Sequence, residues 1–509
     1  IRRNGEVQID QPRSRQHPLG RDMTEVCAQM PDYFGLKAGC RRERRVSGFG
    51  SKRDPARPAG DQCRYAEAGT RPDLPDSDLE SLHQQMRDCL QSRGGEVSAR
   101  AQAAALGYVY LALDTMGRER FLGVLAHEFD VDPAQVDAAI EDLCRAADDD
   151  ARRDCQALLR KTLEAPRIKL LTQFNALPDG VKFLVDMRAD LLALKSRDSA
   201  IRGLEQDLQS LLTTWFDVDF LELMQITWDN ASAALLEKLI AYEAVHAIDG
   251  WDDLKKRLDS DRRCFAYFHP RMPHEPLIFV EVALVNGLAD NIQALLDENA
   301  PVQDPGTTDT AIFYSISNAQ KGLAGISFGH FLIKRVAATL NAEFKGLKTF
   351  ATLSPVPGFM AWLDKKLAEG DPALLTAGDR KALSAAAGRQ GGGKGSLKAL
   401  LAMPGWQNDQ VISEAIRGPL MGLATRYLMN EKGLNKRALD PVAHFHLSNG
   451  ASMESLNWKA DSSPRGLGNS AGIMINYLYD LTRIEDNHEA YTSTGKINAS
   501  SRMRSFLKD

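Results

Sequence analysis

The sequence has no long hydrophobic run, so we expect no membrane-spanning helix. Such a helix needs about 18 consecutive apolar residues, and no segment of this chain approaches that length. Strong charge of one sign is also missing, because the net charge is only −5. A nucleic-acid-binding protein usually carries a concentrated basic face. We therefore expect neither a membrane nor a nucleic acid among the partners of this chain.

The cysteines show no metal-binding pattern. The seven cysteines are odd in number and form no CxxC or zinc-type spacing, and no HExxH run is present. Free thiols in a reducing cytoplasm are the simplest account of these cysteines. We expect no protein-held metal and no cofactor.

A chain of 509 residues is too long for a single core, so two or more domains are expected. Residues 1–70 are rich in Arg, Gly, Pro and Asp without apolar periodicity, which predicts a disordered extension. Residues 71–214 show helical periodicity throughout, and Asp132-Pro133 is an N-cap followed by proline at the first helical position. These helices predict an all-α helical bundle. Its apolar stripes, without visible chemistry, suggest a role in oligomerisation.

Residues 215–509 are predicted to form a second, α+β domain. The runs with strand character cover residues 263–268, 277–284, 310–317 and 347–353. Neighbouring strands of this kind favour an antiparallel meander, and a helix over 326–343 between the last two strands predicts a mixed sheet. A further helix is expected over 216–226.

A helical insertion near 360–437 interrupts this domain. Its run Gly388-Arg-Gln-Gly-Gly-Gly-Lys-Gly-Ser396 nearly matches a phosphate-binding P-loop. Gly395 stands where that motif needs Ser or Thr, and the preceding residues suit a helix instead of a strand, so a flexible insertion is favoured. Beyond the insertion, we expect a strand over 441–447 and a helix over 466–479.

Residues 320–336 follow the order strand, glycine-bearing turn and helix. Gly322 and Gly325 have no Cβ, so the backbone of the turn could approach a phosphate closely. Backbone N–H groups and the helix dipole would then face the anion. A pyrophosphate cradle and an ordinary strand-to-helix turn are both compatible with the glycine spacing, which is a weak signal by itself.

Several ordered motifs resemble the malonyl-CoA decarboxylase family over roughly residues 75–490. The motifs that carry this resemblance are Phe313-Tyr-Ser-Ile-Ser317, Gly322-Leu-Ala-Gly325, Phe331-Leu-Ile-Lys334, Leu353-Ser-Pro-Val-Pro-Gly-Phe359, Phe445-His-Leu447, Trp458-Lys-Ala-Asp461 and Asn476-Tyr-Leu-Tyr479. The resemblance implies an N-terminal helical bundle followed by a catalytic domain of the GNAT acetyltransferase fold. In that fold a Gln/Arg-x-x-Gly-x-Gly/Ala turn holds the coenzyme A pyrophosphate. The run Gln320-Lys-Gly-Leu-Ala-Gly325 departs from this spacing by one shifted glycine.

The resemblance also implies site residues. It assigns catalysis to Ser354 and His446. It places Ser315, Asn476 and Tyr479 at or near the acyl pocket. The candidate substrate-binding residues of the turn are Gly322, Ala324, Gly325, Ile326, Ser327, Phe328, Gly329 and His330. For His330, contact with a phosphate and exposure on the helix surface are both open. Each catalytic residue has an ordinary alternative: a Ser before Pro is usually a turn residue, and a strand His is often a hydrogen-bonded core residue. In a strand, His444 would share the face of His446.

The expected reaction converts malonyl-CoA to acetyl-CoA and carbon dioxide through a thioester enolate. The substrate carboxylate is already ionised near neutral pH, so no strong base is needed. We expect His446, near its natural pKa, to protonate the enolate carbon and Ser354 to hydrogen-bond the carboxylate or relay a proton.

Two other functions stay open: an acyl-CoA-dependent acyltransferase of the GNAT type, and a helical scaffold that only binds acyl-CoA. The resemblance further implies a homotetramer in fatty acid metabolism. Eukaryotic family members end in a peroxisomal signal, and this chain ends in Ser-Phe-Leu-Lys-Asp, which favours the cytoplasm.

Overall fold

A computed structural model of the chain describes residues 70–91, 96–175, 177–216, 220–326, 332–371, 374–389, 397–433 and 436–507. Nearly all of the predicted N-terminal extension lies outside these residues. Within the described ranges, no helix combines the length and the apolar character that crossing a bilayer requires.

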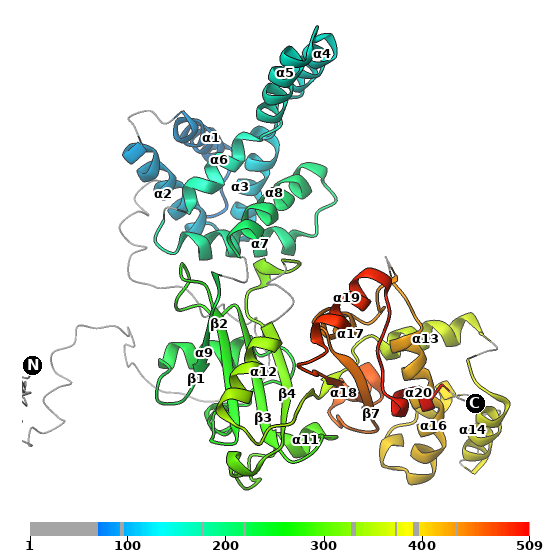
Figure 1. Cartoon of the computed structure of the whole chain (residues 1–509). Helices are drawn as coiled ribbons and strands as arrows, with labels where there is room; N and C mark the ends of the chain where they lie inside the picture. Colours follow the sequence, from blue (N-terminus) through cyan, green and yellow to red (C-terminus); the bar gives the residue numbers. More distant parts are fainter. Residues whose placement is uncertain are drawn as a thin grey trace, which may run out of the picture. The chain divides into compact units, whose positions relative to one another are not determined.

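Helices form the first half of the described chain, as the periodicity predicts (Figure 1). They are α1 (Asp76–Leu90), α2 (Glu96–Ala112), α3 (Thr115–Glu128), α4 (Pro133–Arg145), α5 (Asp149–Thr162), α6 (Pro166–Phe174), α7 (Gly180–Leu194) and α8 (Ser199–Trp215). Aspartates cap the N-termini of four of them by accepting a hydrogen bond from a backbone N–H of the first turn. Each such cap stabilises a helix by about 1 kcal/mol. Fully buried side chains such as Phe121, Phe174 and Leu184 fill the bundle core.

Helices α4 and α5 differ from the rest of the bundle. They pack against each other and extend away from the other helices in Figure 1. Only Ala139 is buried in α4, and α5 has no buried residue. Ile140, Leu158 and Leu163 are exposed instead. This hairpin therefore presents an apolar surface that the described part of the chain does not cover.

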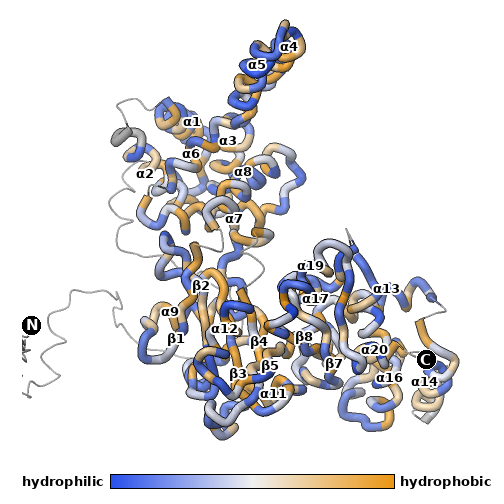
Figure 2. The backbone as a smooth tube through the Cα atoms, in the orientation of Figure 1, coloured by the Kyte–Doolittle hydropathy of each residue, from blue (hydrophilic) through white to orange (hydrophobic). Residues whose placement is uncertain are grey.

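A sheet organises the second half of the chain, in the order β1-β2-β3-β4-β5-β8-β6, with β7 paired to β8. The strands are β1 (Glu222–Ile226), β2 (Arg262–Phe268), β3 (Ile278–Val285), β4 (Thr310–Asn318), β5 (Thr349–Thr352), β6 (Ser354–Pro355), β7 (Ser452–Asn457) and β8 (Met474–Leu478). The pairings are antiparallel except that of β4 with β5, which confirms the predicted mixed sheet. The tube through β2, β3 and β4 is largely apolar, as expected for strands buried on both faces (Figure 2).

Short helices surround the sheet, and the predicted helical insertion is present. The helices near the sheet are α9 (Ala233–Tyr242), α10 (Trp251–Arg257), α11 (Ile292–Leu295), α12 (Leu332–Glu343), α17 (Pro441–Ser448), α18 (Pro464–Ser470), α19 (Ile484–Thr494) and α20 (Ser501–Ser505). The insertion holds α13 (Phe359–Glu369), α14 (Ala377–Arg389), α15 (Leu397–Leu401) and α16 (Gln410–Met429). Most of its glycine-rich run lies outside the described residues.

Three expected elements differ from the structure. Residues 222–226 form strand β1 instead of a helix, because their side chains alternate in exposure and the backbone pairs with β2. Residues 441–448 form helix α17 instead of a strand, because Asp440 caps the helix and Pro441 occupies its first position. Its buried residues Ala443, His446 and Leu447 follow the helical i, i+3, i+4 spacing.

The third difference is the predicted helix over 466–479. The helix α18 ends at Ser470, because Ala471 and Gly472 both adopt positive φ. Strand β8 then begins at Met474, and its first four residues are buried between neighbouring strands. A short, continuous apolar run of this kind does not distinguish a buried strand from a helix by periodicity.

Candidate functional site

Ser354 and His446 are in direct contact. The Ser354 Oγ lies 3.1 Å from the Nε2 of His446, although the residues are 92 positions apart in the chain. Ser354 begins β6, and His446 lies in the last turn of α17. Their exposed fractions are 5% and 4%. The structure therefore brings together the two residues that the resemblance designates as catalytic, in a site largely shielded from water.

Asp440 places His446 by capping its helix. One carboxylate oxygen accepts the Ala443 N–H at 2.9 Å, and the other accepts the Tyr427 hydroxyl at 3.2 Å. The backbone N–H of Gly358, four residues after Ser354, also donates to this carboxylate. Burial raises the pKa of Asp440, while these hydrogen bonds act in the opposite direction. Asp440 thus joins the helix of His446 to the loop of Ser354.

A series of hydrogen bonds connects Thr352, Ser354, His446 and Tyr479. The Ser354 hydroxyl donates to Thr352 Oγ1 at 2.8 Å, and that oxygen also accepts the Tyr477 N–H at 3.1 Å. On the other side, the Nδ1 of His446 lies 2.8 Å from the Tyr479 hydroxyl. Because Ser354 gives its single hydroxyl hydrogen to Thr352, it must accept from His446 Nε2–H. The Tyr479 O–H then donates to the unprotonated Nδ1.

Aromatic rings bury the His446 imidazole and keep it neutral. The ring stacks on Tyr477 with centroids 4.5 Å apart and an interplanar angle of 24°. Burial lowers the pKa of His446 to about 3. The expectation of a histidine near its natural pKa is therefore wrong for this unliganded site, because loss of water disfavours the imidazolium. Burial also raises the pKa of Tyr479 well above its ordinary value, so both partners are neutral near pH 7.

Asn476 holds Thr352, the residue that accepts the Ser354 hydroxyl, in place. Its Nδ2 donates to the carbonyls of Thr352 at 2.7 Å and Ala289 at 2.9 Å. Its Oδ1 accepts from Ser455 Oγ and from Asn457 Nδ2, both at 2.7 Å. These four bonds use the full capacity of the amide. In this structure Asn476 holds Thr352 in place and has no group left for a substrate.

Ser315 lies away from the pair, on the other face of the sheet. In the β3–β4 register, Phe313 pairs with Val282 and Ser315 with Glu281, so Tyr314 is an extra residue in a β-bulge. Phe313 faces the same side as its β5 partner Thr352, and the bulge turns Ser315 to the opposite side. The Ser315 hydroxyl contacts both carboxylate oxygens of Glu243 at 2.8 Å.

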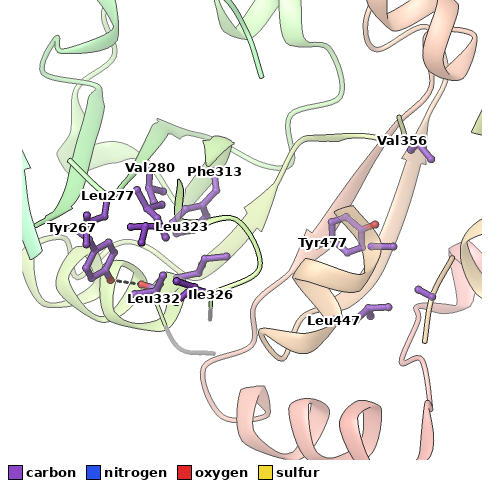
Figure 3. Close-up of a cluster of buried hydrophobic side chains, with 14 of the residues drawn as sticks. Tyr267, Leu277, Val280, Phe313, Leu323, Ile326, Leu332, Val356, Leu447 and Tyr477 are labelled. Carbon is purple, nitrogen blue, oxygen red and sulfur yellow. Dashed lines mark hydrogen bonds between the residues drawn. The ribbon is translucent and has the colours of Figure 1, made fainter. Parts of the chain in front are cut away.

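The glycine-bearing turn after β4 is well anchored. The Gln320 amide donates to the Pro276 carbonyl at 2.9 Å, and a 3₁₀ turn, η4, covers Lys321–Leu323 and ends at Ala324. Leu323 and Ile326 lie in the apolar cluster that Figure 3 shows around Val280 and Phe313. Nearby, the Tyr267 hydroxyl donates to the Leu332 carbonyl at 2.6 Å and fixes the start of α12. Ser327, Phe328, Gly329 and His330 lie outside the described residues.

Positions 322 and 325 of the turn require glycine for different structural reasons. Gly325 has φ of +77°, a conformation that favours glycine. A Cβ at Gly322 would instead overlap the carbonyl oxygen of Val185 in α7. Close approach of the bundle therefore requires glycine at position 322, whereas the sequence alone suggested only approach to a phosphate.

Strand β4 changes its neighbours at the bulge. Its pairing with β5 runs from Thr310 to Phe313, and Phe313 also accepts the Leu353 N–H at 3.1 Å. The chain then passes into β6, which pairs with β8. Along residues 314–318, the structure describes β3 as the strand partner of β4 on one side and no strand partner on the other.

Sequence reasoning missed Thr352, Tyr477 and Asp440. Thr352 stands two residues before Ser354, and strand side chains at this spacing share a face. Its position beside Ser354 could therefore have been predicted. Tyr477 lies within the quoted Asn476-Tyr-Leu-Tyr479 motif, but its stacking on His446 depends on the fold. Asp440-Pro441 carried the same N-cap and proline signal as Asp132-Pro133.

Comparisons with known proteins confirm the resemblance that the sequence motifs indicated. The model of the malonyl-CoA decarboxylase C-terminal domain matches residues 219–509, and that of the N-terminal domain of the same enzyme matches residues 129–216. The mitochondrial malonyl-CoA decarboxylase of Mus musculus is 39% identical over 406 residues, which cover 77% of this chain and 82% of that protein.

Solved structures give the same result. The malonyl-CoA decarboxylase of Rhodopseudomonas palustris is 41% identical with a TM-score of 0.76, covering 84% of this chain and 99% of the other. That of Agrobacterium vitis is 39% identical with a TM-score of 0.75, covering 84% and 100%. From the matched domains and these relatives, we conclude that the chain belongs to the malonyl-CoA decarboxylase family.

Proposed function

We propose that this chain decarboxylates malonyl-CoA to acetyl-CoA and carbon dioxide at the Ser354–His446 pair. The observation that carries the proposal is the 3.1 Å contact between Ser354 Oγ and His446 Nε2 in a buried site. Two residues that are distant in the sequence meet there with a defined hydrogen-bond direction. The family membership of the chain supplies the reaction that such a pair serves.

In the proposed reaction the bond between the carboxylate carbon and the α-carbon breaks. Its electron pair passes into the thioester, which becomes an enolate, and carbon dioxide leaves. The chain must hold the carboxylate out of the thioester plane and stabilise the developing oxyanion with oriented donors. The His446 Nε2–H donates to Ser354 and the Ser354 O–H donates to Thr352 in the structure, and we assign both hydrogens to the substrate when it binds. Their burial strengthens these interactions because little water competes for them.

A proton must then reach the enolate carbon. We assign its delivery to the Nε2–H of His446 in its imidazolium form, directly or through the Ser354 hydroxyl, and the imidazole is then left neutral. The negative charge of the bound substrate raises the pKa of the imidazole relative to the unliganded site. Tyr479, hydrogen-bonded to Nδ1 at 2.8 Å, holds the tautomer that carries hydrogen on Nε2. Asn476 and Thr352 position the serine.

The coenzyme portion of the substrate is proposed to bind along the turn and along residues 314–318 of β4, on the side where the structure describes no strand partner. The turn residues Gly322, Ala324, Gly325 and Ile326, with Ser327, Phe328, Gly329 and His330 beyond them, follow this part of β4. An acetyltransferase-like fold would use these features as a cradle for the pyrophosphate and a track for the pantetheine arm. Ser315, tied to Glu243, would line this track through its backbone.

The decisive experiment incubates the purified chain with malonyl-CoA alone. Acetyl-CoA and carbon dioxide should appear without an acceptor, and Ser354→Ala should abolish most of this turnover. An acyltransferase would need an amine acceptor before any coenzyme A is released. A scaffold that only binds acyl-CoA would show no turnover with or without an acceptor, and either result would overturn the proposal.

We also propose a homotetramer that forms through the helical bundle. The exposed Ile140, Leu158 and Leu163 of the α4–α5 hairpin support this, because a second hairpin could cover them. Light scattering at micromolar concentration should report a tetramer, and Ile140→Glu with Leu158→Glu should shift it to smaller species. A monomer in the unmodified protein would contradict this assembly.

The cytoplasm is the proposed compartment, and fatty acid metabolism the proposed context. Among the described residues, Cys144, Cys155 and Cys264 form no disulfide, which suits a reducing compartment. The curated relatives are named as mitochondrial, so fractionation of expressing cells with a mitochondrial marker tests this assignment directly.

A further inference from the structure

Arg188 connects the helical bundle to the glycine-bearing turn. It lies in α7, with 2% of its surface exposed. Its Nε and Nη2 donate to the Glu205 carboxylate of α8 at 2.9 and 2.7 Å. Its Nη1 donates to the carbonyl oxygens of Gly322 at 2.6 Å and Ala324 at 2.9 Å. One buried guanidinium thus holds two carbonyls of a turn that is 134 residues away in the sequence.

These bonds fix the direction of the turn's amides. In a trans peptide the C=O and the following N–H point in opposite directions. With the Ala324 carbonyl directed at Arg188, the Gly325 N–H must point away from the guanidinium. The N–H groups of Leu323, Ala324 and Ile326 are engaged inside the turn. No backbone carbonyl among the described residues accepts the Gly325 N–H.

We propose that Arg188 is a positioning residue for the coenzyme, which holds the turn so that its open N–H faces the pyrophosphate. This inference rests on the proposed coenzyme A site. The guanidinium does not need to touch the ligand. It sets the orientation of the turn before binding, and pre-organisation of this kind raises affinity by removing an ordering cost. The helical bundle then contributes to coenzyme binding as well as to assembly.

A purely structural role for Arg188 is the alternative, and the bundle contains a matched control. Arg167 is equally buried and pairs with Asp207 of α8 at 2.7 Å. It also donates to a backbone carbonyl, that of Ala126 at 3.0 Å. All these partners of Arg167 lie within the bundle. Its loss should therefore reproduce the cost of removing a buried arginine without disturbing the turn.

The test compares Arg188→Gln, Arg188→Lys and Arg167→Gln by calorimetric titration with coenzyme A. We expect Arg188→Gln to bind roughly 10-fold more weakly or worse, because two charge-assisted hydrogen bonds to the turn are lost. Arg188→Lys should recover part of the affinity, since one ammonium can reach a carbonyl but cannot form the whole fork. Arg167→Gln should lower the melting temperature and leave coenzyme A affinity near that of the unmodified protein.

Steady-state kinetics with two substrates sharpens the test. Malonyl-pantetheine lacks the nucleotide and its pyrophosphate, so it does not use the turn. Arg188→Gln should raise the KM for malonyl-CoA with kcat largely retained, and should leave kcat/KM for malonyl-pantetheine near the unmodified value. Equal losses with both substrates, or the same loss of coenzyme affinity in Arg167→Gln, would overturn the proposal in favour of a structural role. Unchanged coenzyme A affinity in Arg188→Gln would also overturn it.

Failure of the proposed function gives a different result. If the unmodified protein binds coenzyme A but does not decarboxylate malonyl-CoA, the reaction assignment falls while the titrations still test Arg188. If the unmodified protein does not bind coenzyme A, both proposals fall together.

Discussion

The Ser354–His446 pair and the glycine-bearing turn are held in two different ways. The pair is buried by aromatic rings and fixed by a capped helix, and its supporting residues all come from the second half of the chain. The turn is fixed through its backbone carbonyls by an arginine of the helical bundle. If the pair carries the chemistry and the turn holds the coenzyme, as proposed, the two depend on separate supports, and substitutions should affect kcat and affinity independently.

The largest expected effect is the loss of turnover when the pair is broken. Ser354→Ala and His446→Asn should each reduce kcat by about 10²- to 10⁴-fold, the range typical of positioned proton-transfer groups. Coenzyme A affinity, measured by calorimetry, should stay near that of the unmodified protein because the turn is untouched. His444→Asn is the matched control, since His444 lies on the same helix and bonds Tyr491 instead of Ser354. A variant of His446 that retains full activity would contradict the assignment.

Gly325→Val should distort the glycine-bearing turn and leave the Ser354–His446 pair intact. The φ of +77° at this position is strained for a β-branched residue. We expect the turn to distort and coenzyme A to bind about 10-fold more weakly or worse, while circular dichroism shows the fold retained. Calorimetry that gives an unchanged dissociation constant would show that the turn does not hold the coenzyme.

Removal of Asp440 should affect the pair and stability together. Asp440→Ala removes the N-cap of α17 and leaves the Tyr427 hydroxyl without this partner, which should cost about 1–3 kcal/mol of stability. The kcat should fall because His446 moves relative to Ser354, and the KM for malonyl-CoA should change little. Denaturant unfolding and steady-state rates measure the two effects. Asp132→Ala, which uncaps α4 in the bundle, should lower stability alone.

The last expected effect is the pH dependence of stability from His446, which leaves activity at neutral pH unchanged. Burial lowers its folded pKa to about 3 from an ordinary value near 6.5. Between these values the unfolded chain binds a proton that the folded chain does not, so stability falls as pH decreases below about 6.5. At pH 5 this contribution is about 2 kcal/mol relative to pH 8. His446→Asn should therefore lose less stability than the unmodified protein over this interval in denaturant titrations.

Sequence periodicity predicted the helical first half and the mixed sheet, because long apolar stripes and strand runs reflect burial directly. It failed on three short segments, β1, α17 and β8, of which only β8 is buried along nearly its whole length. The Asp132-Pro133 signal correctly predicted the start of α4, whereas the same signal at Asp440-Pro441 was missed and a strand was expected there. Helix α17 nevertheless brings the predicted His446 to Ser354.

The support of the turn could not be predicted from local sequence. Arg188 follows Leu184 and Met187 at the spacing of the apolar stripe of α7, so the pattern indicates a buried cation. Its partners Gly322 and Ala324 are contributed by a segment 134 and 136 residues away. A buried charge needs a partner, but which backbone it contacts is a property of the tertiary fold. The bulge at Tyr314 is likewise set by pairing with β3.

The close approach of α7 to Gly322 has a consequence for protein engineering. Domains joined by a short linker are often exchanged or deleted as independent modules. Here the Val185 carbonyl occupies the space that a Cβ at position 322 would need, and the matching surface of α7 completes the turn. A truncated chain without the bundle, or a chimera with a helical region from a distant relative, would therefore carry a malformed coenzyme turn even if its sheet folded correctly. Any transplant of the catalytic half should include α7 and α8.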